Sequence, residues 1–393
     1  MRTTRRARRP RAGIAAAVSL SLLIGTVCVP AAGQEDDGWS WWAMLVYVFR
    51  ADAVPEPPKL GEKNRERIDQ VKYLAASQLG RDTDAGRLLL GLLALAEGHG
   101  AEAREQFDRL SPAGPDPSLP LRLKAQSYMV DRNFAKAVEL HKEALRKMPR
   151  VRGRSPMTEA NAHLDLAVAY AALRRREQAE ESVRKAKNVL TTTRMAPIDR
   201  AFSYLMVADV YGKVLGKRDA AKAALQNAER ALPRNLAASV DLRIARDIYL
   251  KLGGLSETAI LKKGYFRRAA GTVKGLPEKD RDEANYYVGR KSAQLAGRPL
   301  RADPEFGRFV RMQLEPVVKA EAQDGWTLRR RRAAYAVQAN LARDRDDGDG
   351  LRSAIEGFKA VQNKLISNQI QGFPGRLELR HEPRRDPNAA PRH

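Results

Sequence analysis

The sequence predicts an all-α protein built as a solenoid of stacked helical pairs. Alanine, leucine and arginine recur throughout the 393 residues, while aromatic residues make up 6%, a composition that favours helix over strand. From residue 61 almost to the end, apolar residues recur at helical spacing, which indicates amphipathic helices. A pattern of small residues that begins at Gly91 returns 34 residues later, and a fixed period of this length is typical of stacked repeats.

The N-terminal residues 1–33 have the three parts of a secretory signal peptide. Six arginines between Arg2 and Arg11 precede an apolar run from Ala12 to Val29, and Ala31-Ala32-Gly33 follows. A basic head, an apolar middle and a small-residue exit predict cleavage after Gly33. The alternative is an uncleaved membrane anchor, because the apolar run approaches the ~17–25 residues that span a bilayer.

Removal of residues 1–33 changes the charge and the cysteine content of the mature chain. The formal charge falls from +24 to +18, and Cys28, the single cysteine, is lost. A chain without cysteine suits an oxidising compartment, and it excludes cysteine catalysis and cysteine metal sites. We therefore expect an exported bacterial protein that is periplasmic, associated with the cell envelope or extracellular.

Residues 34–60 form an apolar segment and a linker before the repeats. The segment Trp39–Phe49 carries three of the four tryptophans in eleven residues, which is too short to span a bilayer. We expect it to cover one end of the folded body. The alternative is association with a membrane surface, where tryptophan and tyrosine settle, although the acidic residues Glu35, Asp36 and Asp37 before it oppose contact with anionic headgroups.

Four segments between residues 90 and 233 share a pattern of small and aromatic positions. Gly91 corresponds to Ala125, and Ala103 corresponds to Ala137, each 34 residues on. The positions of the four units are Leu90, Gly91, Ala94, Ala103, Phe107 and Leu110; Ala125, Tyr128, Phe134, Ala137, Ala144 and Pro149; Leu166, Ala167, Tyr170, Ala179, Val183 and Ala186; and Val207, Ala208, Tyr211, Ala221, Leu225, Ala228 and Pro233. The last of these has one extra residue, expected in its turn, and a weaker fifth unit follows with Tyr249, Ala259 and Lys263.

This pattern resembles the tetratricopeptide repeat (TPR), a helix–turn–helix unit of 34 residues. The resemblance implies a right-handed TPR-like helical-hairpin solenoid over residues 61–272. Small residues such as Gly91 and Ala103 let the two helices of a unit approach closely, and Tyr128, Tyr170 and Tyr211 fill the space between helices.

The remaining chain departs from the repeat. Residues 273–371 are expected to form degenerate helical repeats or capping helices, because the last apolar face of a solenoid has no neighbour. Their last pair, with Tyr335, Ala354 and Phe358, is expected to have a long turn. Residues 372–393 are polar and proline-rich, which predicts a disordered tail.

The TPR resemblance also implies where a partner binds, because the first helix of each TPR unit lines a concave groove. This groove suits an amphipathic helix or an extended apolar segment; the alternative is that several of its residues pack in the core. Carried onto this chain, the groove residues are Leu88, Leu92, Leu95, Arg122, Gln126, Met129, Leu164, Val168, Leu205 and Asp209.

No motif in the sequence predicts a catalytic, cofactor-binding or metal-binding residue. The stretch Arg345–Glu356 matches part of a calcium loop, but Arg345 stands at the first ligand position, so we interpret it as a solvated turn. The basic run Arg174–Arg176 lies between two repeat helices and is expected to be a solvated charge run.

Two functions follow from these features. The first is a non-catalytic exported scaffold that binds a protein or peptide segment in its groove, with no enzyme activity and no cofactor. The alternative is a basic cell-envelope-associated protein that binds anionic lipid, wall polymer or nucleic acid through its charge, with nucleic acid as the least expected partner.

Overall fold

The computed structural model describes residues 82–111, 117–148, 156–236, 238–321 and 325–371. The predicted signal peptide, the segment Trp39–Phe49 and the tail at 372–393 lie outside these residues. All regular structure within them is helical, which confirms the predicted all-α class. The chain divides into two compact units, residues 1–277 and 278–393, and each is described by itself.

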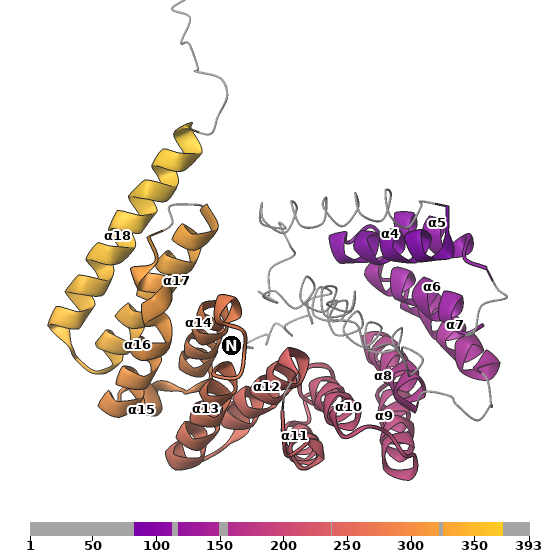
Figure 1. Cartoon of the computed structure of the whole chain (residues 1–393). Coiled ribbons are helices and arrows are strands. Elements are labelled where there is room, and N and C mark those ends of the chain that lie inside the picture. The colour runs from indigo at the N-terminus through magenta and orange to yellow at the C-terminus, as the bar shows by residue number, and fades with distance from the viewer. Residues whose placement is uncertain (1–81, 112–116, 149–155, 237, 322–324, 372–393) are drawn as a thin grey trace, which may run out of the picture. The chain divides into compact units, whose positions relative to one another are not determined.

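The described part of the first unit consists of five consecutive helical pairs (Figure 1). Helix α5 packs on α6, α7 on α8, α9 on α10, and α11 on α12, so successive pairs stack as the repeat pattern predicts. The pairs are α4 (Asp84–Glu97) with α5 (Gly100–Asp108), α6 (Leu119–Val130) with α7 (Phe134–Lys147), α8 (Pro156–Ala172) with α9 (Arg176–Thr192), α10 (Pro197–Asp209) with α11 (Arg218–Ala231), and α12 (Ser239–Leu255) with α13 (Ala259–Val273).

The turns inside the first four pairs share one backbone geometry. Each turn contains a residue with positive φ, and the residue after it donates its backbone N–H to a carbonyl at the end of the first helix; two examples are Asn133 to Tyr128 at 2.8 Å and Arg175 to Tyr170 at 2.9 Å. The positive-φ residues are Gly98, Arg132, Arg174 and Gly216. This shared turn brings Ala103, Ala137, Ala179 and Ala221 to equivalent buried positions, which confirms the predicted register.

Small residues allow the helices of a pair to cross closely. A Cβ atom on Gly91 would overlap the ring of Phe107, and both Ala103 and Phe107 are completely buried. The predicted tyrosines occupy the core between helices: Tyr170 is buried, and Tyr128 and Tyr211 pack against the same cluster. Large side chains such as Phe107 therefore fill the space that the small residues leave at the crossings.

Local signals start several of these helices. Side chains at the N-caps accept hydrogen bonds from backbone N–H groups three residues on, from Gly86 to Thr83 at 3.1 Å and from Lys136 to Asn133 at 3.2 Å. Such caps satisfy N–H groups that have no partner within the helix. Pro197 begins α10, where its missing N–H costs nothing.

Two details of the predicted repeats are wrong. The extra residue of the fourth unit lies in the first helix, which continues as a π-helical turn η2 (Val210–Val214) before a turn of the shared type. In the fifth unit Ala259 is exposed, because Thr258 caps α13 immediately before it. The close crossing there is made instead by Gly253 and Phe266.

The described part of the second unit contains five helices: α14 (Glu278–Leu295), α15 (Arg298–Arg301), α16 (Pro304–Lys319), α17 (Gly325–Asp344) and α18 (Gly348–Gln371). Helix α14 packs on α16, and α17 pairs with α18. The expected long turn in this last pair is wrong, because only residues 345–347 separate the two helices. The wide spacing of Tyr335 and Ala354 comes from the length of α17 and α18, which have 20 and 24 residues.

Candidate functional site

The ten residues predicted to line a groove all lie on the first helices α4, α6, α8 and α10. Nine are buried, and Leu88 is half-buried. Leu92 and Leu95 belong to one hydrophobic cluster with Phe107. A larger cluster contains Met129, Leu164, Val168 and Leu205. These side chains therefore pack in the core, as the alternative interpretation of the groove expected. Their role as a binding surface stays a prediction.

Two polar members of this set, Arg122 and Gln126, lie in a buried polar cluster between α6, α7 and α8. Burial, together with the nearby charge of Arg122, lowers the pKa of His141 to about 3. Burial raises the pKa of Asp165 well above its ordinary value, although Arg122 and Gln126 act in the opposite direction. The repeat pattern does not predict this cluster. Its signal in the sequence is His141, at the position where the other three units have Phe107, Val183 and Leu225.

Asp209, the last predicted groove residue, forms an ion pair. Lys251 Nζ lies 2.6 Å from both carboxylate oxygens, and Lys213 Nζ lies 3.3 Å from Oδ1. Burial alone would raise the pKa of Asp209, but the two lysines lower it. Asp209 thus links α10 to α12 as an ionised group.

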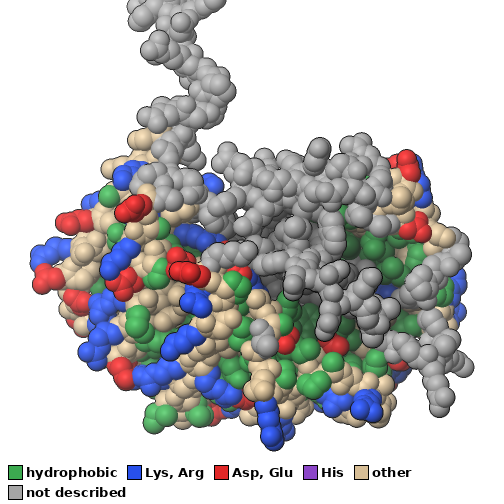
Figure 2. Space-filling view, viewed as in Figure 1, with side chains coloured by type: hydrophobic (Ala, Val, Ile, Leu, Met, Phe, Trp, Pro, Cys, Tyr) green, Lys and Arg blue, Asp and Glu red, His purple; other side chains and the backbone are tan. Residues whose placement is uncertain are grey.

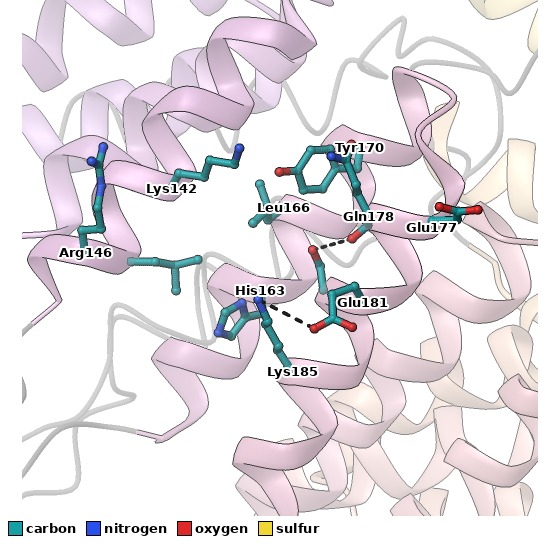
Figure 3. A pocket seen from close by; sticks show the side chains of 11 residues that line it. Lys142, Arg146, His163, Leu166, Tyr170, Glu177, Gln178, Glu181 and Lys185 are labelled. Atoms are coloured by element: carbon teal, nitrogen blue, oxygen red, sulfur yellow. Dashed lines mark hydrogen bonds and ion pairs between the residues drawn. The ribbon is translucent and has the colours of Figure 1, made fainter.

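A cleft of about 830 Å³ opens between α7 and α9, the second helices of neighbouring pairs, with α8 as its floor (Figure 3). Its residues come from three different helices, which only the stacking of the pairs brings together. The lining residues are Lys142, Leu145, Arg146, His163, Leu166, Tyr170, Glu177, Gln178, Glu181, Ser182 and Lys185.

The floor of the cleft is largely apolar. His163, Leu166 and Tyr170 are spaced by three and four residues on α8, so they project from the same side of that helix. Leu166 and Tyr170 are 6% and 5% exposed, and Leu145 of α7 is half-buried beside them. The floor can therefore accept an apolar side chain with little rearrangement.

The two walls of the cleft carry different charges. On the α7 side Lys142 and Arg146 are exposed, and Lys142 Nζ lies 5.6 Å from the centroid of the Tyr170 ring. On the α9 side stand Glu177 and Glu181 (Figure 3). Oppositely charged walls beside an apolar floor can orient a bound segment.

The α9 wall also contains groups that pair with each other. Lys185 Nζ lies 3.8 Å from Glu181 Oε1, and the Ser182 hydroxyl donates to the backbone carbonyl of Gln178 at 2.8 Å. Glu177 and the α7 cations Lys142 and Arg146 are thus the groups of the cleft that are available to a charged partner.

The structure gives no metal centre among the residues it describes, where no three His, Cys, Asp or Glu side chains gather into a possible ligand set. The calcium-loop-like stretch has another role. Asp347 Oδ1 accepts the backbone N–H of Gly350 at 2.8 Å, and Arg345 Nη2 lies 3.4 Å from Asp347 Oδ2. This stretch is the turn that caps α18.

Comparisons with known proteins do not place the chain in a family. No family model matches it, and no curated protein matches it. One solved structure with some similarity is that of the Rap conjugation gene regulator of the plasmid pLS20 in complex with the Phr* peptide. It is 15% identical, covers 93% of this chain and 99% of its own, and has a TM-score of 0.29. The repeat fold is therefore defined by the helical pairs of this chain alone.

Among the helices of the described residues, none combines the length and the apolar character needed to cross a bilayer.

Proposed function

We propose that this chain is a non-catalytic helical-repeat scaffold that binds a segment of another protein in the cleft between α7 and α9. The observation that carries the proposal is the combination of an apolar floor, at Leu166 and Tyr170, with a cationic wall on one side. Helical-repeat proteins present such surfaces to extended or helical segments of their partners.

The chemistry of the cleft defines the segment that fits. An aliphatic or aromatic side chain would rest on Leu145, Leu166 and Tyr170. Acidic groups on one flank would face Lys142 and Arg146, and a basic group on the other flank would face Glu177. The partner is therefore an amphipathic segment whose charges are divided between its two edges.

The place of action and two further contact surfaces belong to the same proposal. The N-terminal residues 1–33 support export to the periplasm, the cell envelope or the exterior. The groove set from Leu88 to Asp209 is a second candidate surface for the partner. The segment Trp39–Phe49 is a candidate for contact with the membrane surface.

Capture from a cell-envelope extract tests the cleft. The bait is the chain from residue 34 onward, compared with the double variant Lys142→Glu/Arg146→Glu. A matched control, Arg194→Glu/Arg230→Glu, reverses two exposed cations outside the cleft and changes the net charge equally. We expect wild type and control to retain a protein that the cleft variant loses.

The same experiment separates the cleft from the groove. Leu88→Glu places a charge on the half-buried member of the groove set. Loss of the partner with Leu88→Glu, together with normal retention by the cleft variant, would move the site to the groove. Equal retention by all variants would contradict both surfaces.

A further inference from the structure

The turns between the two helices of each pair form one continuous edge of the first unit. Ion pairs connect a turn to the second helix of a neighbouring pair: Asp131 Oδ2 to Arg104 Nη1 of α5 at 2.5 Å, Lys217 Nζ to Glu180 Oε2 of α9 at 2.6 Å, and Glu257 Oε1 to Lys222 Nζ of α11 at 3.1 Å. We call the residues 98–99, 131–133, 174–176, 216–218 and 256–261 the turn edge.

Four arginines of the turn edge are exposed and have no polar partner among the residues that the structure describes. They are Arg132, Arg174, Arg175 and Arg218. Within the described residues their side chains form no ion pair and no hydrogen bond, whereas the neighbouring Arg176 pairs with Glu180 at 3.1 Å. Their charges are therefore available to an external anion.

The backbone at two of these arginines is unfavourable for a side chain. Arg132 and Arg174 have φ of 62° and 61°, in the left-handed region where glycine is preferred. Glycine does occupy the equivalent position in the other two turns, at Gly98 and Gly216. Arginine at this position costs conformational free energy, and no ion pair or side-chain hydrogen bond within the described residues compensates for it.

The charge of the other two arginines is also unfavourable for the helices. Arg175 is the N-cap of α9, and Arg218 begins α11, where a cation opposes the helix dipole. Two exposed acids next to the turn edge, Glu177 and Asp219, lie in the first turns of the same helices, where the dipole favours them. Helix stability thus explains these two acids but not the arginines of the turn edge.

The opposite edge of the unit provides a contrast. Lys147 lies in the last turn of α7 and Arg230 in the last turn of α11, where a cation stabilises the helix. On the face seen in Figure 2, basic and acidic side chains are interspersed over the described helices. The turn edge therefore differs from the opposite edge in the placement of its cations, which are unpaired and oppose the helix dipole or the preferred backbone conformation, and not in net charge.

Two aliphatic side chains extend the turn edge at its α13 end. Ile260 and Leu261 are 83% and 53% exposed, in the first turn of α13 after the N-cap Thr258. They lie three and four residues after Glu257, which forms an ion pair with Lys222 of α11. Transfer of these two adjacent aliphatic side chains from water into an apolar phase would be favourable, because it removes their apolar area from water.

We propose that the turn edge docks on the surface of an anionic phospholipid bilayer. The arginines face the phosphate groups, and Ile260 and Leu261 enter the boundary between headgroups and acyl chains. A soluble polyanion would satisfy the arginines but would leave the aliphatic pair in water. The bilayer is therefore the partner that accounts for both features.

Vesicle binding of the full chain tests this proposal with two charge-matched variants. The edge variant combines Arg132→Gly, Arg174→Gly, Arg175→Gln and Arg218→Gln. The control combines Lys147→Gln, Arg194→Gln, Arg230→Gln and Arg234→Gln, which removes four exposed cations from the opposite edge. Both variants retain Trp39–Phe49, so any difference between them reports on the position of the charge.

The vesicles contain phosphatidylcholine with or without phosphatidylglycerol. We expect the affinity for the anionic vesicles to fall at least about tenfold in the edge variant and to stay within about twofold in the control. Thermal unfolding should show that both variants remain folded, since glycine suits the backbone at residues 132 and 174. Equal losses in the two variants would overturn the proposal in favour of net charge.

A third variant, Ile260→Ser/Leu261→Ser, separates a bilayer from a soluble polyanion. It should weaken binding to anionic vesicles most clearly at high salt, where the contribution of the arginines is screened. Binding to duplex DNA, used as a soluble polyanion, should not respond to it. If the third variant leaves vesicle binding unchanged while the edge variant loses DNA and vesicles alike, the bilayer proposal is overturned.

Discussion

Lys251 on α12 donates to both carboxylate oxygens of Asp209 on α10, at 2.6 Å each. The two residues are 42 positions apart and connect the first helices of two neighbouring pairs. The Asp209 side chain is 11% exposed and that of Lys251 is 29% exposed. Both charges are therefore largely removed from water, and either one would be unfavourable without the other. Removal of the pair tests how far neighbouring helical pairs depend on each other for stability.

The two ends of this pair should not be equivalent in stability. Asp209→Asn removes the carboxylate to which Lys251 donates and should cost about 3 kcal/mol in the free energy of unfolding. Lys251→Met should cost less, because Lys213 still lies 3.3 Å from the Asp209 carboxylate. Urea unfolding of both variants at neutral pH measures the difference, and a larger loss in Lys251→Met would contradict this account.

The contribution of Asp209 should also depend on pH. Its lysine partners hold its pKa below the ordinary value in the folded state, so the folded protein binds this proton less readily than the unfolded chain. The stabilisation is complete above the unfolded pKa of about 3.9 and is lost as pH falls through the folded value. The gap between wild type and Asp209→Asn should therefore be constant from pH 7 to pH 5 and close below about pH 4.

A methyl group on Gly91 should destabilise the α4–α5 crossing. Its Cβ would overlap the Phe107 ring, so Gly91→Ala should cost about 1–3 kcal/mol. Gly264→Ala is the control, because a Cβ there meets nothing within 4 Å and alanine should stabilise the exposed helix by about 0.5–1 kcal/mol. If Phe107 is the cause, Phe107→Leu and Gly91→Ala should be coupled in a double-mutant cycle.

Replacing His141 by leucine should stabilise the protein. The side chain is completely buried, neither ring nitrogen has a hydrogen-bond partner among the described residues, and equivalent positions hold apolar side chains. His141→Leu should gain about 1–3 kcal/mol at pH 8 by removing unsatisfied polar atoms. The exposed His99, replaced by glutamine, is the control and should change stability little.

The gain from His141→Leu should increase as pH falls. Burial lowers the pKa of His141 from 6.5 to about 3, so below pH 6.5 the unfolded chain binds a proton that the folded protein does not. Wild type then loses about 1.4 kcal/mol per pH unit, and the leucine variant does not. Unfolding measured from pH 8 to pH 5 checks this slope; a constant gap would mean that His141 titrates normally in the folded state.

The positive-φ turn positions should prefer glycine. Arg174→Gly should raise the free energy of unfolding by about 0.5–1 kcal/mol, because it relieves a left-handed conformation. The reciprocal change Gly216→Ala should lower it by about 1 kcal/mol. A Cβ on Gly216 meets nothing within 4 Å, so its effect is confined to the backbone. Thermal unfolding of the two variants should move in opposite directions.

Much of the fold was predictable because its signals are local. Helical spacing, small residues at the crossings and tyrosines between helices are properties of short stretches, and residues such as Ala137 and Ala179 lie where the repeat pattern predicts. Insertions were harder to place. The extra residue before Lys217 could enter a turn or a helix, and it forms a π-helical turn because the shared turn geometry is retained.

The candidate site was less predictable, because it depends on which helix surfaces remain uncovered after stacking. The predicted groove residues are apolar and helically spaced, which are also the properties of core residues. The cleft combines Lys142, Leu166 and Glu177 from three helices, and no spacing within one helix indicates that they meet. The buried cluster around His141 is hidden in the same way.

The sequence by itself determined that this protein is all-α, that its helices come in repeated pairs and where small side chains let them cross, since these depend on contacts within one unit. The tertiary structure decided that Lys251 meets Asp209, that a cleft lies between α7 and α9, and that unpaired arginines share one edge. These relationships join different units, and their geometry depends on how each pair stacks on the next.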